Sequence, residues 1–485
     1  MTLNRGEIVG KVTIEKKITS IVYIDSTTLD NDRLDSLFYH NEYIENIQKL
    51  IKSGLPIEKL DNTIETINAP IGWQGIPSDS YMNSGEGVPL LRIKNINELL
   101  LDEESLIGVQ EEIYNAQPAI QAQANDIIIT RVGTIGRVCR IPERISKIAM
   151  GQNLTRIKLK ETMLESGFML AYMSSKFCQL QMQRYAYGGV QASLTNKNIK
   201  NLLVPIPSLE IQKYIGDKVR KAEQLREEAK RLKKEAEEII YKYIGKFEVN
   251  VSKQYSVQYI SEQNIYERID SEYYNCKYIV IENYLNSKGY KLVRLGEVCK
   301  NIQNGKTYGV GNYKTKYLNI GVGELGDWFV EASENKYITE DVNEKLILNP
   351  NTIVWGNSAH LAKYIGEKVN IIMESGKFIP TTEVTAIEPD EKRINPYYLF
   401  LFMNSKWGYY QIQRTVKGMT AHSYPQDIEN IVVPLINFSD EEKDKFKTYV
   451  FKSYFNSKHS KQLIQEAKKD VEDLIEGNFD MSKIR

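Results

Sequence analysis

The stretch RLDSLFYHNEYIENIQKLIKSGLPIEKL, residues 33–60, occurs a second time in altered form as RIDSEYYNCKYIVIENYLNSKGYKLVRL, residues 268–295. Identical residues, such as Arg33 and Arg268, recur at a constant offset of 235 over 28 positions without a gap. A repeat of this length indicates a duplicated structural unit. The chain is therefore predicted to fold as two copies of one domain.

The duplication continues through the remainder of each half of the chain. The further aligned stretches are NDIIITR (125–131) with NTIVWGN (351–357), YMSSKFCQLQMQR (172–184) with FMNSKWGYYQIQR (402–414), and NIKNLLVPIP (198–207) with DIENIVVPLI (427–436). The first pair is apolar and rich in β-branched residues, which is typical of a buried strand. The copies differ most in their middle parts, which fits one scaffold that carries two different binding surfaces.

A long segment with a helical pattern follows each copy. Apolar or small residues recur in steps of three and four through residues 208–246, and again through residues 437–478. This spacing draws one continuous apolar seam along each helix. Ser208 is expected to cap the first helix and Asp440 the second. A helix of about 35 residues is roughly 50 Å long, and such a seam needs a partner, so we expect the two helices to pack as an antiparallel coiled coil.

The predicted fold is α+β, with two repeated globular α/β domains that are each followed by a long helix. The expected boundaries are residues 1–207 and 247–436 for the domains, 208–246 and 437–478 for the helices, and 479–485 for a tail. The helices could form a coiled coil without a special role. Their placement after each repeat favours a spacer that sets the distance between the two domains.

Composition is that of an ordinary cytoplasmic globular protein. Of the 485 residues, 42% are hydrophobic and 26% are charged. No apolar run is long enough for a membrane span, and the N-terminus lacks the apolar core of a signal peptide. The four cysteines form no CxxC pair, which indicates reduced thiols. Lys plus Arg equals Asp plus Glu at 63 each, so any nucleic-acid binding must use local charge patches.

Catalytic motifs are not evident in the sequence. No GxxxxGK[ST] phosphate loop is present, and GVGELG (321–326) is read as a turn because no amphipathic helix follows it. NPYY (395–398) is similar to the NPPY motif of adenine methyltransferases, but its third residue is Tyr, and Pro396 is expected to open a helix. The four histidines lie far from one another and from the cysteines, so no metal site is predicted. We expect neither a cofactor nor a catalytic role.

Three segments in each copy have the composition of DNA-reading loops. The first follows the buried strand (129–140 and 355–366), the second is a Gly-containing loop (184–201 and 414–430), and the third follows the opening strand (67–75 and 301–314). Their polar and basic side chains suit base edges and phosphates. The residues predicted to contact DNA are Arg131, Thr134, Arg137, Gly188, Gly189, Gln191, Ser193, Thr195, Lys197, Lys306, Tyr308, Asn357, Lys417, Thr420 and His422. The alternative is that these segments are ordinary hairpins and loops with polar surfaces.

The chain resembles the specificity (S) subunits of type I restriction–modification systems over essentially its whole length. The resemblance lies in RLDSLFY and RIDSEYY, in the loop GGVQASLT (188–195), and in the run LLVPIPSLEIQKYI (202–215). It implies two target-recognition domains that each read one half of a split site in double-stranded DNA. It also implies helices that set the spacing and dock two methylation (M) subunits, with restriction (R) subunits as further partners. The second copy has KGMTAHSYP (417–425) in place of the GGVQASLT loop.

Two other functions remain open at this point. A self-contained DNA methyltransferase or nuclease would bind S-adenosylmethionine or cut DNA by itself. A coiled-coil protein scaffold would show no difference in affinity between DNA sequences.

Overall fold

The structure is a computed structural model that describes residues 33–484 apart from 34, 71–75, 98, 104, 187–191, 248–267 and 333. It divides into two compact units. The first unit contains the described residues up to Gln224 and from His459 onward, and the second unit runs from Leu225 to Lys458. The first copy of the repeat lies in the first unit and the second copy in the second unit.

Strands in the first unit form two larger sheets and two ribbons. The four-stranded sheet has the order β10-β9-β12-β2, the five-stranded sheet β3-β7-β4-β11-β8, and the ribbons are β1-β13 and β5-β6. The elements are α1 (Asn41–Lys52), β1 (Ile57–Lys59), α2 (Leu60–Thr63), β2 (Ile64–Asn68), β3 (Tyr81–Met82), β4 (Val88–Leu91), β5 (Ile96–Asn97), β6 (Leu100–Leu101), β7 (Ile107–Val109), α3 (Glu111–Ala116), β8 (Gln121–Ala122), β9 (Ile127–Thr130), β10 (Val138–Arg140), β11 (Ile148–Met150), β12 (Leu154–Leu159), α4 (Ser166–Ser174), α5 (Lys176–Ala186), α6 (Asn196–Lys200) and β13 (Leu203–Pro205).

The second unit repeats the order of the four-stranded sheet and, without a counterpart of β8, that of the five-stranded sheet. Its sheets are β15-β23-β19-β21 and β16-β18-β17-β22, with the ribbons β14-β25 and β20-β24. The elements are α8 (Cys276–Ser287), β14 (Lys291–Arg294), α9 (Leu295–Val298), β15 (Cys299–Asn304), β16 (Val310–Gly311), β17 (Leu318–Ile320), β18 (Tyr337–Ile338), β19 (Ile353–Gly356), β20 (Ser358–Ala359), β21 (Val369–Ile371), β22 (Phe378–Pro380), β23 (Val384–Pro389), α10 (Pro396–Asn404), α11 (Lys406–Thr415), β24 (Ala421–His422), α12 (Pro425–Ile428) and β25 (Val432–Leu435).

Corresponding strands pair in the same sense in both units, so the predicted duplication is confirmed. β4 pairs with β11 in parallel, as β17 does with β22, while β9 and β19 are antiparallel to β12 and β23. The stretches NDIIITR and NTIVWGN form β9 and β19, whose side chains are buried throughout. The described parts of the copies differ most in the middle, where β5, β6 and β8 of the first unit have no counterpart among the named strands of the second.

Each core lies between the four-stranded sheet and a pair of helices. In the second unit α10 begins at Pro396, as the sequence predicts, and Asn395 caps it by accepting from the backbone N–H groups of Tyr397 and Tyr398. The Tyr398 hydroxyl donates to the Pro434 carbonyl at 2.5 Å and so ties α10 to β25. α4 occupies the same place in the first unit, and every side chain from Gly167 to Met173 is buried.

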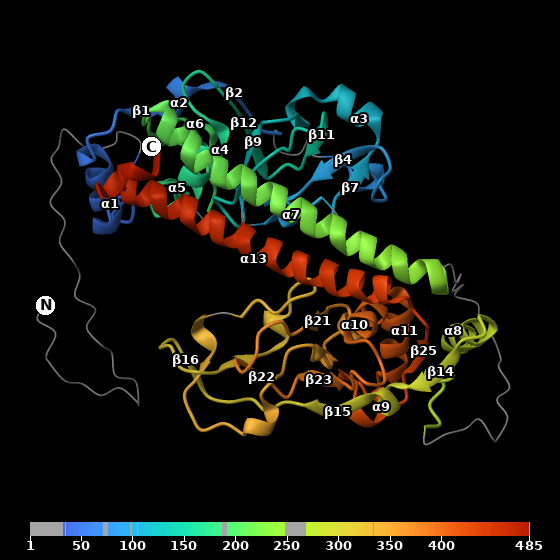
Figure 1. Ribbon diagram of the computed structural model, residues 1–485. Coiled ribbons are helices and arrows are strands. Elements are labelled where there is room, and N and C mark those ends of the chain that lie inside the picture. Colours follow the sequence, from blue (N-terminus) through green and yellow to red (C-terminus); the bar gives the residue numbers. More distant parts are fainter. Residues whose placement is uncertain are drawn as a thin grey trace, which may run out of the picture. The chain divides into compact units, whose positions relative to one another are not determined.

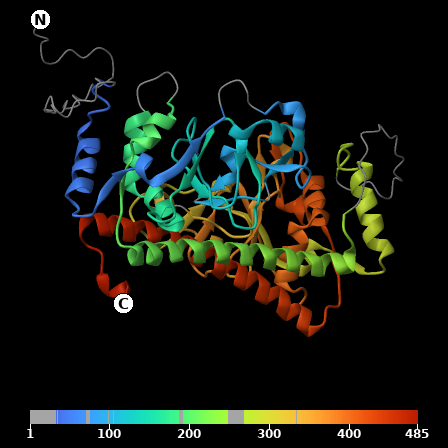
Figure 2. The ribbon, with the colours of Figure 1, turned by 90° about the horizontal axis from the view of Figure 1, so that it is seen from above.

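Both long helices form as expected: α7 spans Leu209–Ile244 with 36 residues, and α13 spans Asp440–Glu476 with 37. Figures 1 and 2 show the green α7 beside the red α13. In the first unit Ser460 donates to the Ala222 carbonyl at 2.8 Å, and Lys218 forms an ion pair with Asp470 at 2.5 Å. The residue nearer the N-terminus of α7, Lys218, thus contacts the residue nearer the C-terminus of α13, Asp470. The two helices are therefore antiparallel.

The same pairing holds within the second unit. Ser453 Oγ donates to the Ala229 carbonyl at 3.2 Å, and the Tyr243 hydroxyl donates to Glu442 at 2.6 Å. Small residues at the seam, such as Ser453, let the helix backbones approach closely. Their hydroxyl groups donate hydrogen bonds to carbonyl groups of the facing helix. The expected antiparallel coiled coil is confirmed in each unit.

The caps of the long helices follow the sequence prediction in one case only. Ser208 accepts from the backbone N–H of Ile211 at 3.5 Å, as expected for the cap of α7. In α13 the cap is Ser439 and not Asp440, because Ser439 Oγ accepts from the Glu442 N–H and the Glu442 carboxylate accepts from the Ser439 N–H, both at 3.2 Å. This reciprocal arrangement needs a Ser and a Glu three residues apart, a spacing that Ser439 provides and Asp440 does not.

A carboxylate that joins α13 to the second domain should make stability depend on pH. Hydrogen bonds from Lys458 and Tyr454 hold the pKa of Glu374 at about 2. A lowered pKa stabilises the folded state above the ordinary pKa of 4.5, and this contribution disappears as the pH falls toward 2. Urea denaturation should therefore find Glu374→Gln less stable than the parent chain at pH 7, with a difference that shrinks at pH 2–3. Glu367→Gln, at an exposed glutamate, is the control, and a difference unchanged with pH would contradict this expectation.

Candidate nucleic-acid interface

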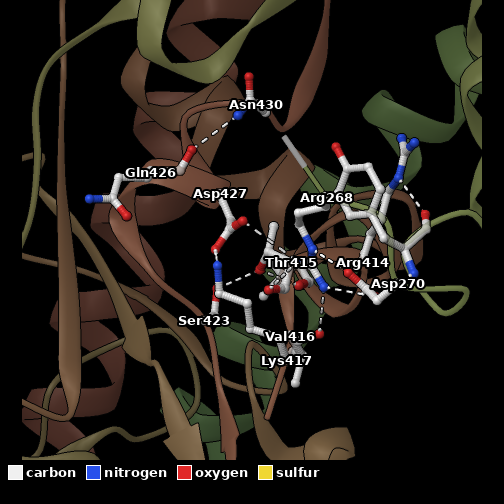
Figure 3. Close-up of polar contacts among 12 residues, drawn as sticks. Arg268, Asp270, Arg414, Thr415, Val416, Lys417, Ser423, Gln426, Asp427 and Asn430 are labelled. Atoms are coloured by element: carbon white, nitrogen blue, oxygen red, sulfur yellow. Dashed lines mark hydrogen bonds and ion pairs between the residues drawn. The ribbon is translucent and has the colours of Figure 1, made fainter. Parts of the chain in front are cut away.

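The repeated Arg-x-Asp motif holds the end of helix α11 in the second copy (Figure 3). Arg268 donates to Asp270 twice, through Nε at 2.7 Å and through Nη2 at 3.0 Å. Nη1 donates to the Thr415 carbonyl at 3.0 Å and Nη2 to the Val416 carbonyl at 3.4 Å. Carbonyls at a helix C-terminus lack partners within the helix and attract cations. The motif therefore fixes the point at which the second candidate segment leaves α11.

Asp427 extends this network to the far end of the same segment. Its side chain, 10% exposed, lies 3.6 Å from Arg268 Nη1 and 2.6 Å from Lys417 Nζ. Figure 3 shows Asp427 between these two cations. Asp427 belongs to α12, near the C-terminal end of the segment 414–430, so one carboxylate joins the two ends of the loop. We name the group Arg268, Asp270, Lys417 and Asp427 the loop clamp.

The first copy has a corresponding arrangement. Arg33 Nε donates to Asp35 at 2.7 Å, and its Nη1 lies 3.4 Å from the Tyr185 carbonyl at the end of α5. Asn198, at the position of Asp427, donates to the same carbonyl at 3.4 Å. A neutral amide thus replaces the carboxylate of the second copy. Sequence reasoning used these arginines only as markers of the repeat, although their recurrence with an Asp two residues later signalled a common structural role.

A second arginine supports the clamp in each copy. Arg184 Nε donates to the Phe38 carbonyl at 2.9 Å, and its guanidinium lies 3.9 Å from the centre of the Phe38 ring. Arg414 contacts Tyr273 in the same way, with 3.1 Å to the carbonyl and 4.4 Å to the ring centre. These contacts fasten the repeated motif to the last helix before the loop.

The three candidate segments of each copy meet at one position, which is Arg131 in the first copy. Its backbone carbonyl accepts from the Leu194 N–H of the second segment at 2.8 Å. Its guanidinium donates to the Pro70 carbonyl of the third segment at 3.0 Å and to the Gln152 carbonyl at 3.2 Å. Partial burial lowers the pKa of Arg131. This side chain joins loops together within the protein.

Asn357 is the equivalent position in the second copy. Its carbonyl accepts from the Ser423 N–H at 2.8 Å, and its buried amide donates to the Thr382 carbonyl and to Thr385 Oγ1, both at 3.1 Å. Thr385 in turn donates to Asn304 of the third segment at 2.6 Å. We name Arg131 and Asn357 the hub residues.

The second segment of the second copy is a hairpin. Lys417 and His422 exchange backbone hydrogen bonds of 2.8 and 3.0 Å, and β24 pairs with β20 of the first segment. The His422 ring stacks on Tyr424, with 6.0 Å between ring centres and an angle of 19°. Thr420 is exposed at the turn. The first and second segments of the second copy are therefore joined by this strand pair.

The remaining predicted DNA-contacting residues divide by exposure. Gly188, Gly189 and Gln191 lie outside the described residues. The exposed residues are Thr134, Arg137, Ser193, Thr195, Lys197, Lys306, Lys417 and Thr420. Tyr308 is buried, and its hydroxyl accepts from the Asn343 N–H at 2.9 Å, so it supports its loop from within, as Asn357 does.

A buried ion pair fixes the turn of the first segment to the long helix of its own unit. Arg140 forms an ion pair with Glu223 of α7, and burial raises the pKa of Glu223 against the opposing effect of Arg140. Gly133 and Gly136 adopt positive φ angles of 78° and 83°, which a tight turn requires. The exposed Thr134 and Arg137 thus project from a turn with a fixed base.

Within the described residues there is no group of three or more His, Cys, Asp or Glu side chains placed to hold a metal ion. The same part of the chain has no helix both long and apolar enough to cross a membrane.

Comparison with known proteins identifies the class of domain. Residues 74–238 match the family described as type I restriction modification DNA specificity domain. This stretch contains the first segment, the second segment and most of α7. This match agrees with the resemblance seen in the sequence.

Individual relatives agree with this class. The chain is 28% identical over 183 residues to the type I restriction enzyme EcoBI specificity subunit of Escherichia coli, covering 38% of this chain and 37% of the relative. It is 27% identical over 164 residues to a putative type I restriction enzyme MjaX specificity subunit of Methanocaldococcus jannaschii, covering 34% and 36%. The chain thus matches little more than a third of the length of these curated relatives. A crystal structure of a type I restriction–modification S subunit from M. genitalium aligns with 88% of this chain and 96% of its own, at 14% identity and a TM-score of 0.43.

Proposed function

We propose that this chain is the DNA specificity subunit of a type I restriction–modification complex, in which each copy of the repeat reads one half of a bipartite site in double-stranded DNA. The observation that carries this proposal is the position of the hub residues, Arg131 and Asn357. In the first copy Arg131 contacts both other loops directly. In the second copy Asn357 contacts the second loop directly and the third loop through Thr385, while the side chains exposed on the two surfaces differ. One scaffold that presents two sets of side chains suits the reading of two different sequences.

We further propose a separate role for the domains and for the long helices. Residues 1–207 and 247–436 are the target-recognition domains, and the helices of 208–246 and 437–478 set the spacing and dock two methylation subunits. The chain itself is non-catalytic in this proposal, and methylation subunits supply the S-adenosylmethionine chemistry. Restriction subunits join the same assembly. A net charge of zero fits a subunit whose affinity for DNA phosphates is shared with such partners.

The proposal is tested by binding selection. The chain, assembled with its methylation subunits, is incubated with random double-stranded DNA, and the bound fraction is sequenced. We expect enrichment of a site with two short specified halves separated by an unspecified spacer of constant length. Methylated positions mapped in the host genome, with and without this chain, should coincide with that site. Enrichment of no site would contradict the proposal, and S-adenosylmethionine binding by the isolated chain would favour an enzyme instead.

A further inference from the structure

An apolar side chain at the tip of the hairpin of the second copy is fully exposed to solvent. Met419 lies at the turn between Lys417 and His422 and has a relative exposure of 107%. Gly418 precedes it with φ +88°, a conformation that favours glycine and turns the backbone at the tip. Covering a large apolar side chain that is fully exposed to water lowers the free energy of the complex.

The surroundings of this tip are those of a base-reading surface. β20 and β24 pair Ser358 with His422 and Ala359 with Ala421, and Leu361, two residues beyond β20, is 53% exposed. Lys417 Nζ lies 5.1 Å from the centre of the Tyr424 ring, on which His422 also stacks. Met419 thus lies in the sequence between Lys417 and His422, whose ammonium and imidazole groups can hydrogen-bond to base edges or phosphates.

The base of the hairpin is held on both sides. The loop clamp fixes Lys417 through Asp427 and Arg268, and the Asn357 carbonyl holds Ser423. In addition, Thr415 and Ser423 share a buried hydrogen bond between their hydroxyl groups. The backbone that carries Met419 is therefore fixed before DNA binds, which limits the entropy lost on contact.

We infer that Met419 contacts the C5 methyl group of a thymine in the major groove, an inference that rests on the proposed function. An apolar side chain distinguishes thymine in that groove because no other unmodified base has the methyl group. Insertion as a wedge between bases is disfavoured, since unstacking a base step costs about as much free energy as burial of one methionine side chain returns. Contact with a methyl group needs no unstacking and uses a single side chain.

Deoxyuridine substitution tests this contact, because deoxyuridine differs from thymidine only in that methyl group. Each thymine of the half-site read by the second copy is replaced in turn, and the affinity of the assembled complex is measured at one salt concentration. We expect substitution at one position to reduce the affinity about fourfold, which is the effect expected from the loss of one buried methyl group. With Met419→Ala this difference between thymine and uracil should disappear, and with Met419→Leu it should remain.

Met481→Ala is the matched control, since Met481 is also exposed, at 56%, and lies outside the three segments. It should leave the difference unchanged. Equal affinity for thymine and uracil at every position, a half-site without thymine, or a difference that survives in Met419→Ala would each overturn the contact while leaving the proposed function intact. A complex without any site preference would overturn the proposed function and the contact with it.

Discussion

Replacing Arg268 by alanine is expected to weaken binding to one half of the DNA site and to cost about 2–4 kcal/mol of folding free energy. Arg268 has a side chain that is 10% exposed, and it neutralises Asp427, which is equally buried. Its loss would leave the Thr415 and Val416 carbonyls without a donor and Asp427 with Lys417 as its remaining cation in the clamp. Both ends of the hairpin would then be released together.

Half-site affinities measured on DNA with either half randomised provide the test. Arg268→Ala should reduce discrimination at the half read by the second copy only. Arg33→Ala is the matched variant, since Arg33 holds the end of α5 in the first copy, and it should affect the other half alone. Arg268→Lys should recover little, because one ammonium group cannot reproduce the fork of donors. If both alanine variants reduced discrimination at both halves equally, the two copies would not read their half-sites independently.

Replacing Trp407 by alanine is expected to cost about 3–5 kcal/mol, the range for deletion of a buried aromatic side chain. Trp407 is 1% exposed, and its indole N–H donates to the Gly245 carbonyl at 2.9 Å. The ring stacks on Tyr284, with 4.6 Å between ring centres, and meets Phe247 edge-on at 4.8 Å. One side chain therefore joins α11 to α8 and to the residues that follow α7.

Urea denaturation of the second unit, followed by fluorescence of its remaining tryptophans, would measure this loss. Trp407→Phe should cost less than Trp407→Ala, because phenylalanine is the residue at the same place in the first copy, where Phe177 is fully buried. Tyr313→Ala, at a side chain that is 64% exposed, should change stability by at most about 0.5 kcal/mol. A loss at Trp407→Ala no larger than that of Tyr313→Ala would show that the contact carries little of the folding free energy.

Some of the interface could be predicted because it depends on local chemistry. Gly133 and Gly136, in the segment 129–140, favour a tight turn by residue type, and both have positive φ angles. The exposure of individual side chains could not be predicted, since it depends on strands that are distant in the sequence. Asn357 and Tyr308 have the polar groups of DNA-reading residues, yet the protein backbone and side chains take up their hydrogen bonds. Similarly, an acidic residue at the start of α13 suggested a cap, but the neighbouring Ser439 forms it with Glu442.

The duplication, the buried strands β9 and β19, and the two long helices follow from the order of the residues, because periodicity and repetition are properties of that order. Tertiary contacts, in contrast, bring three loops together around Arg131 and around Asn357 and place the Arg-x-Asp motif against the helix ends. The physical reason is that these hydrogen bonds and ion pairs join residues up to 159 positions apart, as Arg268 and Asp427 show, and no local pattern specifies which distant carbonyl or carboxylate a buried guanidinium will meet.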